Sequence, residues 1–302
     1  MDRAMVGREY AGHLTDADLG LLVTATGAGT GGSTAAGGAA GAGTDSLRGD
    51  PERLLALLEQ PAAFRTVLGQ GDDPARGWTV GASPFLVFAV LVHREAAELA
   101  GLGHVPERTG LRQRVPLFDA PALRDFLAAP DRKLFLAELL ASFTRVASGR
   151  YRVRAGGRTR TRRFSELDPV RLAGMVEAVP AAERPGVYRR LGDVSLFLTG
   201  VFPDYAASEA LGPVNAARLL RAARLPGDQQ QRLAGVPAIE LLEYLGARWY
   251  RAARDLAPVT TARITVAADV ADRFRQARRV LNHLADRYLL APGQPWLEQP
   301  GG

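Results

Sequence analysis

Residues 83–95 have the sequence SPFLVFAVLVHRE, in which eight apolar residues stand between a serine–proline pair and a charged end. A membrane span needs about 18 or more apolar residues, so this run is too short to cross a bilayer. Ser83 suits the N-cap position of a helix, and proline is favoured at the first helical position. The stretch therefore predicts a buried helix in the core of a soluble protein.

The same helix-start pattern recurs at Asp50-Pro51 and at Asp168-Pro169. Apolar residues follow at spacings of three and four, which is the period of an amphipathic helix. We expect the two longest helices over about residues 237–256 and 264–290, packed as an antiparallel pair. The sequence thus predicts a mainly α, bundle-like fold.

One segment departs from the helical period. Residues 150–164, RYRVRAGGRTRTRRF, alternate with period two on both sides of Gly156-Gly157, which predicts a β-hairpin inserted among the helices. The hairpin carries no acidic residue, and its arginines are Arg150, Arg152, Arg154, Arg158, Arg160, Arg162 and Arg163. Removing these seven from the net charge of +6 leaves −1, so the basic character of the chain is local.

Two interpretations of this charge stay open. Closely spaced guanidinium groups on a ribbon suit a polyanion, either an acidic protein or a nucleic acid. The same charges would also keep an exposed sheet edge from pairing with other chains, with acidic residues of neighbouring helices as counter-charges. Neither a helix-turn-helix pattern nor a basic recognition helix accompanies the hairpin.

The hairpin stands between two helical halves, which suggests a soft domain boundary near its start. We expect an N-terminal helical region over residues 1–149, with a flexible glycine- and alanine-rich loop at 27–44. The hairpin at 150–164, a C-terminal helical region at 165–291 and a tail at 292–302 complete the chain. One continuous helical domain with an inserted hairpin is the alternative.

The composition excludes several kinds of site. The chain has no cysteine, which excludes disulfides, thiolate metal sites and thiol nucleophiles and favours a reducing compartment. Lys133 is the only lysine and follows no glycine-rich loop, which excludes a Walker A site, and we expect Lys133 to face solvent. The first residues lack the apolar run of a secretory signal, so we expect a cytoplasmic protein without membrane contact.

The familiar catalytic patterns are incomplete. Residues 27–32, GAGTGG, match a phosphate-binding fingerprint but lead into further glycine and alanine, without the helix and parallel strands of a βαβ unit. The four histidines form no metal-binding pattern, and we assign the helically spaced carboxylates Glu95/Glu98 and Glu240/Glu243 to solvated faces. The sequence predicts no catalytic residue, no cofactor and no metal. It favours a non-enzymatic interaction protein, and whether any catalysis occurs stays open.

Residues 188–204, YRRLGDVSLFLTGVFPD, place Asp193, Ser195 and Thr199 within an otherwise apolar helix. Buried polar groups need partners, and Arg189 and Arg190 stand four and three residues before Asp193, close enough to pair with it. A buried structural ion pair is the favoured interpretation. The alternative is an enzyme or small-molecule sensor whose pocket near Asp193 includes Tyr188, Arg189, Tyr244 and Tyr250.

Three segments carry a resemblance to other proteins: residues 188–204, the stretch SPFLVFAVL at 83–91 and the stretch YLGARWY at 244–250. Over about residues 80–290 the chain resembles uncharacterised helical proteins of high-GC, actinobacterial-type bacteria. The resemblance implies a bacterial source, and it implies no activity, ligand or site residue. The oligomeric state stays open, and a homo-oligomer is among the alternatives.

Overall fold

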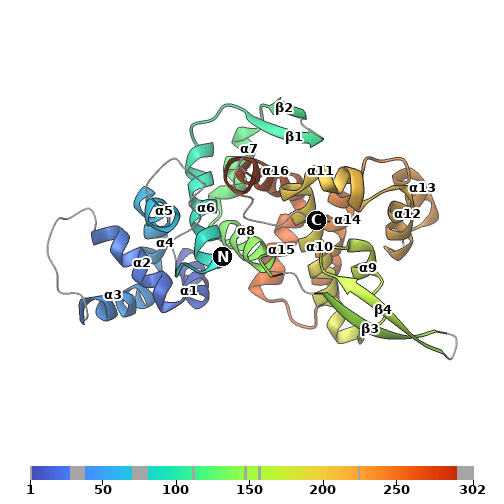
Figure 1. The fold of residues 1–302 in the computed structure, drawn as a ribbon, viewed down its shortest axis with the longest axis horizontal. Coiled ribbons are helices and arrows are strands. Elements are labelled where there is room, and N and C mark those ends of the chain that lie inside the picture. The colour runs from blue at the N-terminus through green and yellow to red at the C-terminus, as the bar shows by residue number, and fades with distance from the viewer. Residues whose placement is uncertain are drawn as a thin grey trace. The chain divides into compact units, whose positions relative to one another are not determined.

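The computed structural model describes residues 2–27, 38–69, 81–110, 113–145, 148–155, 158–223 and 225–290 (Figure 1). These residues form a mainly α-helical protein with an arginine-rich β-hairpin inserted between helices, as predicted. The chain divides into two compact units. Among the described residues, unit 1 holds the chain up to Val105, Phe118–Thr144 and the residues from Leu284, and unit 2 holds Pro106–Leu117 and Arg145–His283.

Unit 1 is helical, and its buried centre is the helix predicted from residues 83–95. Its elements are α1 (Arg3–His13), α2 (Asp16–Gly27), α3 (Gly38–Gly49), α4 (Pro51–Leu58), α5 (Pro61–Leu68), α6 (Pro84–Leu99), α7 (Ala120–Ala128), α8 (Pro130–Ser142) and the π-helical turn η4 (Ala285–Leu289). The apolar run of α6, residues 85–92, is at most 7% exposed. Helix α6 contacts α5, α7 and α8, so its apolar length is buried by neighbouring helices on several sides.

The predicted helix starts form as expected. Ser83 Oγ accepts a hydrogen bond from the backbone N–H three residues further on, at 3.2 Å. Asp50 Oδ1 and Asp168 Oδ1 each accept the corresponding bond at 3.0 Å. These side chains satisfy N–H groups that have no partner inside the first turn of a helix. The local sequence is therefore sufficient to define these three helix starts.

The glycine- and alanine-rich segment at 27–44 contains more helix than expected. Helix α2 ends at Gly27 and α3 begins at Gly38, so residues 38–44 belong to a helix instead of a loop. Residues 28–37 lie outside the described residues. Alanine has the highest helix propensity, and α3 contacts α2, which favours the helical state of residues 38–44.

Unit 2 combines helices with two short sheets. Its elements are β1 (Val105–Gly110), β2 (Gln113–Leu117), β3 (Ser148–Ala155), β4 (Arg158–Ser165), α9 (Pro169–Ala173), the 3₁₀ turn η2 (Ala181–Glu183), α10 (Arg184–Val201), α11 (Pro203–Tyr205), the π-helical turn η3 (Ala206–Ala210), α12 (Pro213–Ala222), α13 (Gly227–Leu233), α14 (Ala238–Leu256), α15 (Ala262–Asp272) and α16 (Phe274–Leu284). Helices α10 and α14 lie against each other in its core.

Glycine residues let the core helices of unit 2 approach closely. A Cβ atom on Gly192 of α10 would lie 2.4 Å from the ring of Tyr250 of α14. A Cβ atom on Gly246 of α14 would likewise lie 2.5 Å from the ring of Phe274 of α16. Aromatic rings thus pack directly on helix backbone at both places. This close packing brings the polar residues of α10 and α14 within hydrogen-bonding reach of each other.

The helix predicted over residues 264–290 is interrupted in the structure. Helix α15 ends at Asp272, Arg273 adopts φ −125° and ψ 30°, and α16 begins at Phe274. The ring centroid of Phe274 lies 6.0 Å from that of Tyr250. The expected pairing of the last helices is seen as a contact between α14 and α15.

A second hairpin, which the sequence reasoning missed, is formed by β1 and β2. Pro106 lies in β1 and Pro116 in β2. Proline lacks a backbone N–H and is restricted to edge positions in sheets, so a sequence that contains it is not typical of a strand. Residues 111–112, which connect the two strands, lie outside the described residues. The consequence for function is that β1 brings Glu107 into unit 2.

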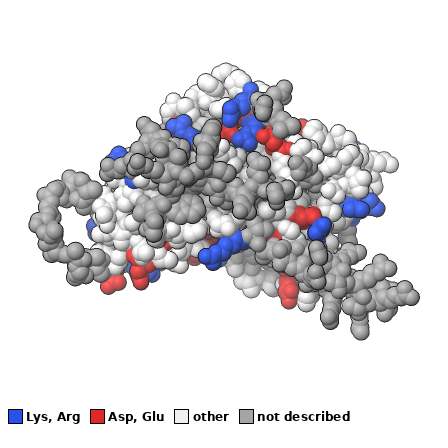
Figure 2. All heavy atoms as spheres, in the orientation of Figure 1, with Lys and Arg blue, Asp and Glu red and all other residues white. Residues whose placement is uncertain are grey.

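None of the described helices is long and apolar enough to span a membrane. On the face shown in Figure 2, the described basic and acidic side chains lie beside each other in small groups. No broad region of a single sign is seen among the described residues of that face. This mixture agrees with the near-neutral balance that the sequence has outside its hairpin.

Candidate functional site

Strands β3 and β4 form a two-stranded sheet, which we call the arginine ribbon. The strands pair antiparallel from Ser148 opposite Ser165 to Ala155 opposite Arg158. Gly156, Gly157 and the side chains of residues 148–164 lie outside the described parts of the structure. Strand β4 leads into α9 and contacts it, and the ribbon extends outward from α9 in Figure 1.

The strand register divides the seven arginines between the two faces of the ribbon. Directly opposed residues of antiparallel strands share a face, and successive residues alternate between faces. The polar face contains arginine, serine and threonine positions: Ser148, Arg150, Arg152, Arg154, Thr159, Thr161, Arg163 and Ser165. The mixed face contains Gly149, Tyr151, Val153, Ala155, Arg158, Arg160, Arg162 and Phe164.

The predicted pairing of Asp193 is confirmed. Arg189 Nε and Arg190 Nη1 lie 3.9 and 4.0 Å from Asp193 Oδ2. The hydroxyl of Tyr250 donates a hydrogen bond of 2.9 Å to Asp193 Oδ1. Burial raises the pKa of Tyr250 well above its ordinary value, and the adjacent Asp193 carboxylate adds to this effect. The phenol therefore stays protonated and joins α14 to α10.

The two hydroxyl residues of the same helix also find partners. Ser195 Oγ donates to the Leu191 carbonyl at 2.8 Å, and Thr199 Oγ1 donates to the Ser195 carbonyl at 2.7 Å. Both residues are fully buried. Back-bonding to the preceding turn satisfies polar groups that would otherwise lack a partner in the core. The hydroxyl groups of Ser195 and Thr199 are thus hydrogen-bonded to carbonyl groups of α10 itself.

The five residues of the predicted pocket fall into two places. Asp193, Arg189 and Tyr250 belong to the buried network of α10 and α14. Tyr188 and Tyr244 instead line a pocket of about 320 Å³, which we call the tyrosine pocket. Helices α10 and α14 and Ala223, the residue after α12, contribute to it. A ligand site at Asp193 stays a prediction. The structure adds that Tyr188 and Tyr244 line the tyrosine pocket, whereas Asp193 and Tyr250 do not.

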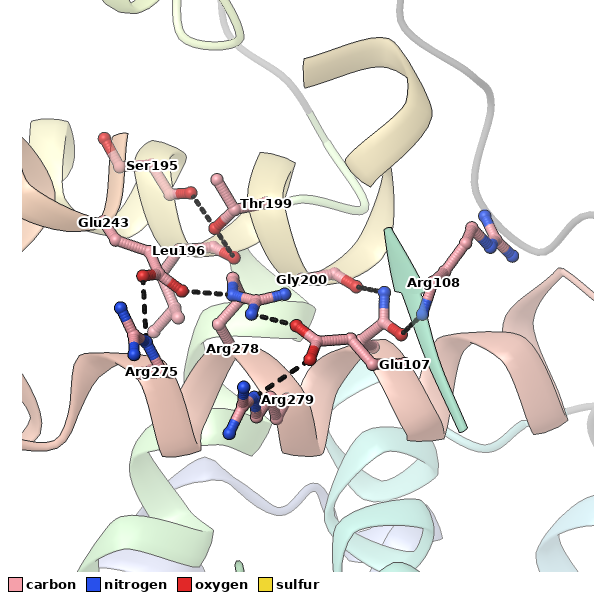
Figure 3. Close-up of polar contacts among 11 residues, drawn as sticks. Glu107, Arg108, Ser195, Leu196, Thr199, Gly200, Glu243, Arg275, Arg278 and Arg279 are labelled. Atoms are coloured by element: carbon pink, nitrogen blue, oxygen red, sulfur yellow. Dashed lines mark hydrogen bonds and ion pairs between the residues drawn. The ribbon is translucent and has the colours of Figure 1, made fainter. Parts of the chain in front are cut away.

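A ladder of alternating arginines and glutamates joins α14, α16 and β1 (Figure 3). Arg278 lies at its centre, where Nε donates to Glu243 Oε1 and Nη2 donates to Glu107 Oε1. Arg275 Nε donates to the second oxygen of Glu243 at 3.3 Å, and Arg279 Nε donates to the second oxygen of Glu107 at 3.1 Å. We call these five residues the arginine–glutamate ladder.

The ladder is buried at its centre and open to solvent at its Arg275 end. Arg278, Glu107 and Glu243 are 4, 7 and 8% exposed, whereas the side chain of Arg275 is 60% exposed. A pocket of about 400 Å³ opens beside the ladder and is also lined by Glu240. Buried charges are tolerated when each is paired and hydrogen-bonded, and every member of the ladder meets this condition. The ladder therefore holds the β1 strand onto α14 and α16.

The β1 strand has a second anchor next to the ladder. The backbone N–H of Arg108 donates to Asn282 Oδ1 at 3.0 Å, and the side-chain amide of Asn282 reaches the Gly200 carbonyl at 3.5 Å. Arg108 Nη1 lies 3.6 Å from Asp204 Oδ2. The strand thus contacts residues of α11 and α16, and Asn282 links it onward to α10. Figure 3 shows the Glu107 side chain directed toward Arg278 and Arg279, and the Arg108 side chain directed away from them.

Sequence reasoning missed the ladder, and it assigned Glu243 to a solvated face. Arg275, Arg278 and Arg279 follow the helical spacing of three and four, which is the pattern that could have indicated a shared face. Glu107 lies in an unexpected strand more than 160 residues away in the sequence. Helical spacing cannot reveal a partner at that separation, so the sequence did not predict that Glu243 is buried.

Three further predictions concern buried groups of unit 1. Lys133 was expected to face solvent, but it is 8% exposed and its Nζ lies 3.3 Å from Glu59 Oε1. Glu95 was expected on a solvated face, but it is fully buried. His93, one of the histidines without a metal pattern, is 3% exposed and lies 3.2 Å from the Tyr10 hydroxyl. Burial lowers the pKa of His93 well below its ordinary value, and Lys133 and Arg3 lower it further.

No cluster of three or more histidine or carboxylate groups suited to a metal ion occurs within the described ranges. Comparisons of the chain with protein-family models, curated proteins and solved structures find no match.

Proposed function

We propose that this protein is a non-enzymatic binding protein that contacts the phosphate backbone of a nucleic acid through the polar face of the arginine ribbon. The observation that carries the proposal is the composition of that face. Four arginine positions share that face with two serine and two threonine positions, and the ribbon carries no acidic residue. Arginine, serine and threonine are the side chains that commonly donate hydrogen bonds to phosphate oxygens.

The ribbon geometry supports a nucleic acid over an acidic protein. A two-stranded ribbon is narrow enough to enter a major groove, where phosphates flank it on both sides. The mixed face adds Arg158, Arg160 and Arg162, so both faces of the ribbon carry positive charge. An acidic protein surface would engage mainly one face, whereas a groove engages both.

The contrast with the rest of unit 2 also supports the proposal. Exposed arginines of its helices pair with carboxylates close by, as Arg232 does with Asp228 and Arg251 with Asp272, both at 2.9 Å. The ribbon sequence supplies no such counter-charge of its own. A strand edge needs few charges to prevent unwanted pairing. Seven arginines without an acidic residue exceed that need and favour a polyanionic partner.

The test is a binding titration of the full chain with a short fluorescently labelled DNA duplex at increasing salt concentrations. The variant R150S/R152S/R154S removes three positive charges from the polar face. The matched control R218S/R221S/R232S removes three exposed arginines from α12 and α13. We expect the ribbon variant to bind more weakly than the control. Its plot of log affinity against log salt should also be shallower, by about 0.9 for each lost phosphate contact.

Each outcome decides the proposal. Equal losses in the two variants would show that binding follows net charge and not the ribbon. Failure of the wild-type chain to bind the duplex and a single-stranded DNA would reject a nucleic acid. Binding of polyglutamate, but of neither DNA, would replace it with an acidic protein as the partner.

A further inference from the structure

The tyrosine pocket combines aromatic and cationic side chains in one hollow. It has a volume of about 320 Å³, which is near the lower end of the range of ligand pockets, roughly 300–1,000 Å³. Its lining residues are Tyr188, Ala223, Tyr244, Arg248, Trp249, Arg251, Ala252 and Asp255. The volume suits a ligand with a single ring system better than a nucleotide or a peptide.

Three charged side chains besides the aromatic ones decide the electrostatics of the pocket. Arg251 Nη2 lies 2.9 Å from Asp272 Oδ1, and Asp255 Oδ1 accepts a bond of 2.9 Å from Arg254. Arg248 differs from both. Within the part of the chain that the structure describes, its guanidinium makes no ion pair or hydrogen bond. Arg248 therefore gives the pocket a positive charge that no carboxylate of the described residues pairs with.

The aromatic groups of the pocket come from two helices. Tyr188 lies in α10, and Tyr244 and Trp249 lie in α14. Tyr244 precedes Arg248 by four residues, so the ring and the guanidinium are neighbours on one helix face. The Tyr188 hydroxyl and the Trp249 indole N–H have no hydrogen-bond partner among the described residues. The Tyr188 hydroxyl is thus a polar donor available to a ligand at the aromatic wall, whereas Trp249 is only 3% exposed.

We propose that the tyrosine pocket binds a small aromatic carboxylate. The ring would lie against the tyrosines and Trp249, where a planar ligand gains stacking and apolar contact. The carboxylate would accept two parallel hydrogen bonds from Arg248, the geometry for which guanidinium is best suited. A cationic ligand is disfavoured because the carboxylate of Asp255 is already paired with Arg254. This inference is independent of the arginine ribbon and of nucleic-acid binding.

The experiment is isothermal titration calorimetry of the full chain with 4-hydroxybenzoate. Two comparison ligands separate the parts of the proposal: cyclohexanecarboxylate keeps the charge without the aromatic ring, and 4-hydroxybenzamide keeps the ring without the charge. We expect both to bind more weakly than 4-hydroxybenzoate. The variant R248Q should weaken binding of 4-hydroxybenzoate by about tenfold or more, because a charge-assisted pair of hydrogen bonds is lost.

The control variant is R232Q, which removes an exposed arginine of α13 that does not line the pocket. It should bind 4-hydroxybenzoate as the wild type does. Arg248 is exposed, so R248Q is expected to fold normally, and its far-ultraviolet circular dichroism should match that of the wild type. The variant Y188L tests the ring contact and should also weaken binding.

Three results would overturn the proposal. The first is the absence of 4-hydroxybenzoate binding to the wild type at millimolar concentrations. The second is unchanged affinity in R248Q. The third is equal affinity for cyclohexanecarboxylate, which would remove the aromatic part of the assignment.

Discussion

The hydroxyl of Tyr250 in α14 donates a hydrogen bond of 2.9 Å to Oδ1 of Asp193 in α10. Replacement of Tyr250 by phenylalanine removes this donor and keeps the ring that packs on Gly192. Hydrogen bonds to charged groups contribute about 1.5–3 kcal/mol, so we expect the free energy of unfolding in urea to fall by about that amount. The control Y244F loses only an exposed contact of 3.4 Å to Gln229 and should change stability by less than about 0.5 kcal/mol. Equal effects of the two changes would contradict the structural role of the buried bond.

Buried tyrosines predict a loss of stability at high pH. Burial raises the pKa of Tyr250 and of Tyr10 well above the ordinary value of about 10, with nearby carboxylates adding to both shifts. Above that value the unfolded chain releases a proton that the folded chain retains, so raising the pH favours unfolding. Urea titrations should show full stability below about pH 10 and a decline above it. For each pH unit in that range, the free energy of unfolding of Y250F should fall by up to about 1.4 kcal/mol less than that of the wild type. Parallel curves for the two proteins would exclude Tyr250 as a cause.

The burial of His93 predicts a loss of stability at low pH. Its pKa in the folded state lies well below the ordinary value of about 6.5, because burial disfavours the charged ring. Below that value the unfolded chain binds a proton that the folded chain excludes, so stability falls as the pH falls. The variant H93Q removes this titration. Between about pH 6.5 and 5 its free energy of unfolding should fall less steeply than that of the wild type, by up to about 1.4 kcal/mol per pH unit. The same slope of unfolding free energy against pH in H93Q and in the wild type would exclude His93 as the cause.

Glu107 and Glu240 line the same pocket and predict very different effects of the same substitution. E107Q removes one of the two carboxylates that neutralise buried Arg278. Breaking a buried ion pair costs about 3–5 kcal/mol, and we expect a loss of this order in urea unfolding. E240Q changes an exposed carboxylate that has no partner among the described residues, so its effect should stay below about 0.5 kcal/mol. A small effect of E107Q would mean that the ladder does not hold β1 in place.

Two glycines of α10 predict opposite effects of alanine. In G192A the new methyl group would meet the Tyr250 ring at 2.4 Å, and overpacking of this kind costs about 1–3 kcal/mol. Gly186 has no heavy atom within 4 Å of such a methyl group. Alanine there should be neutral or stabilise the helix by up to about 1 kcal/mol. Thermal unfolding of both variants checks the pair, and a stable G192A would argue against the close approach of α10 and α14.

Local sequence was sufficient for the features that depend on neighbouring residues. The cap–proline pairs at Asp50, Ser83 and Asp168 predicted helix starts because both the capping bond and the proline restraint act within one turn. The alternation around residues 156–157 predicted the hairpin, since side-chain direction in a strand has a period of two. The location of the excess charge also followed directly from counting arginines.

Prediction was incomplete where a strand or helix depended on distant packing. Prolines obscured β1 and β2, and no glycine or proline marks the interruption at Arg273. The candidate pocket was named around Asp193 because its residues lie in two conspicuous segments. In the structure, α10 and α14 place Tyr250 against Asp193, and they leave Tyr188 and Tyr244 at a separate hollow.

The sequence by itself determined the helical class, three helix starts, the hairpin and the position of its charge, because these follow from interactions within a few residues. Tertiary structure alone decided that Glu243 and Lys133 are buried, that Glu107 meets Arg278, and that Arg248 has no counter-charge among the described residues. The physical reason is that the protonation and pairing of a charged group depend on which distant elements exclude water from it. That exclusion is a property of the packed units, and no local period of the sequence encodes it.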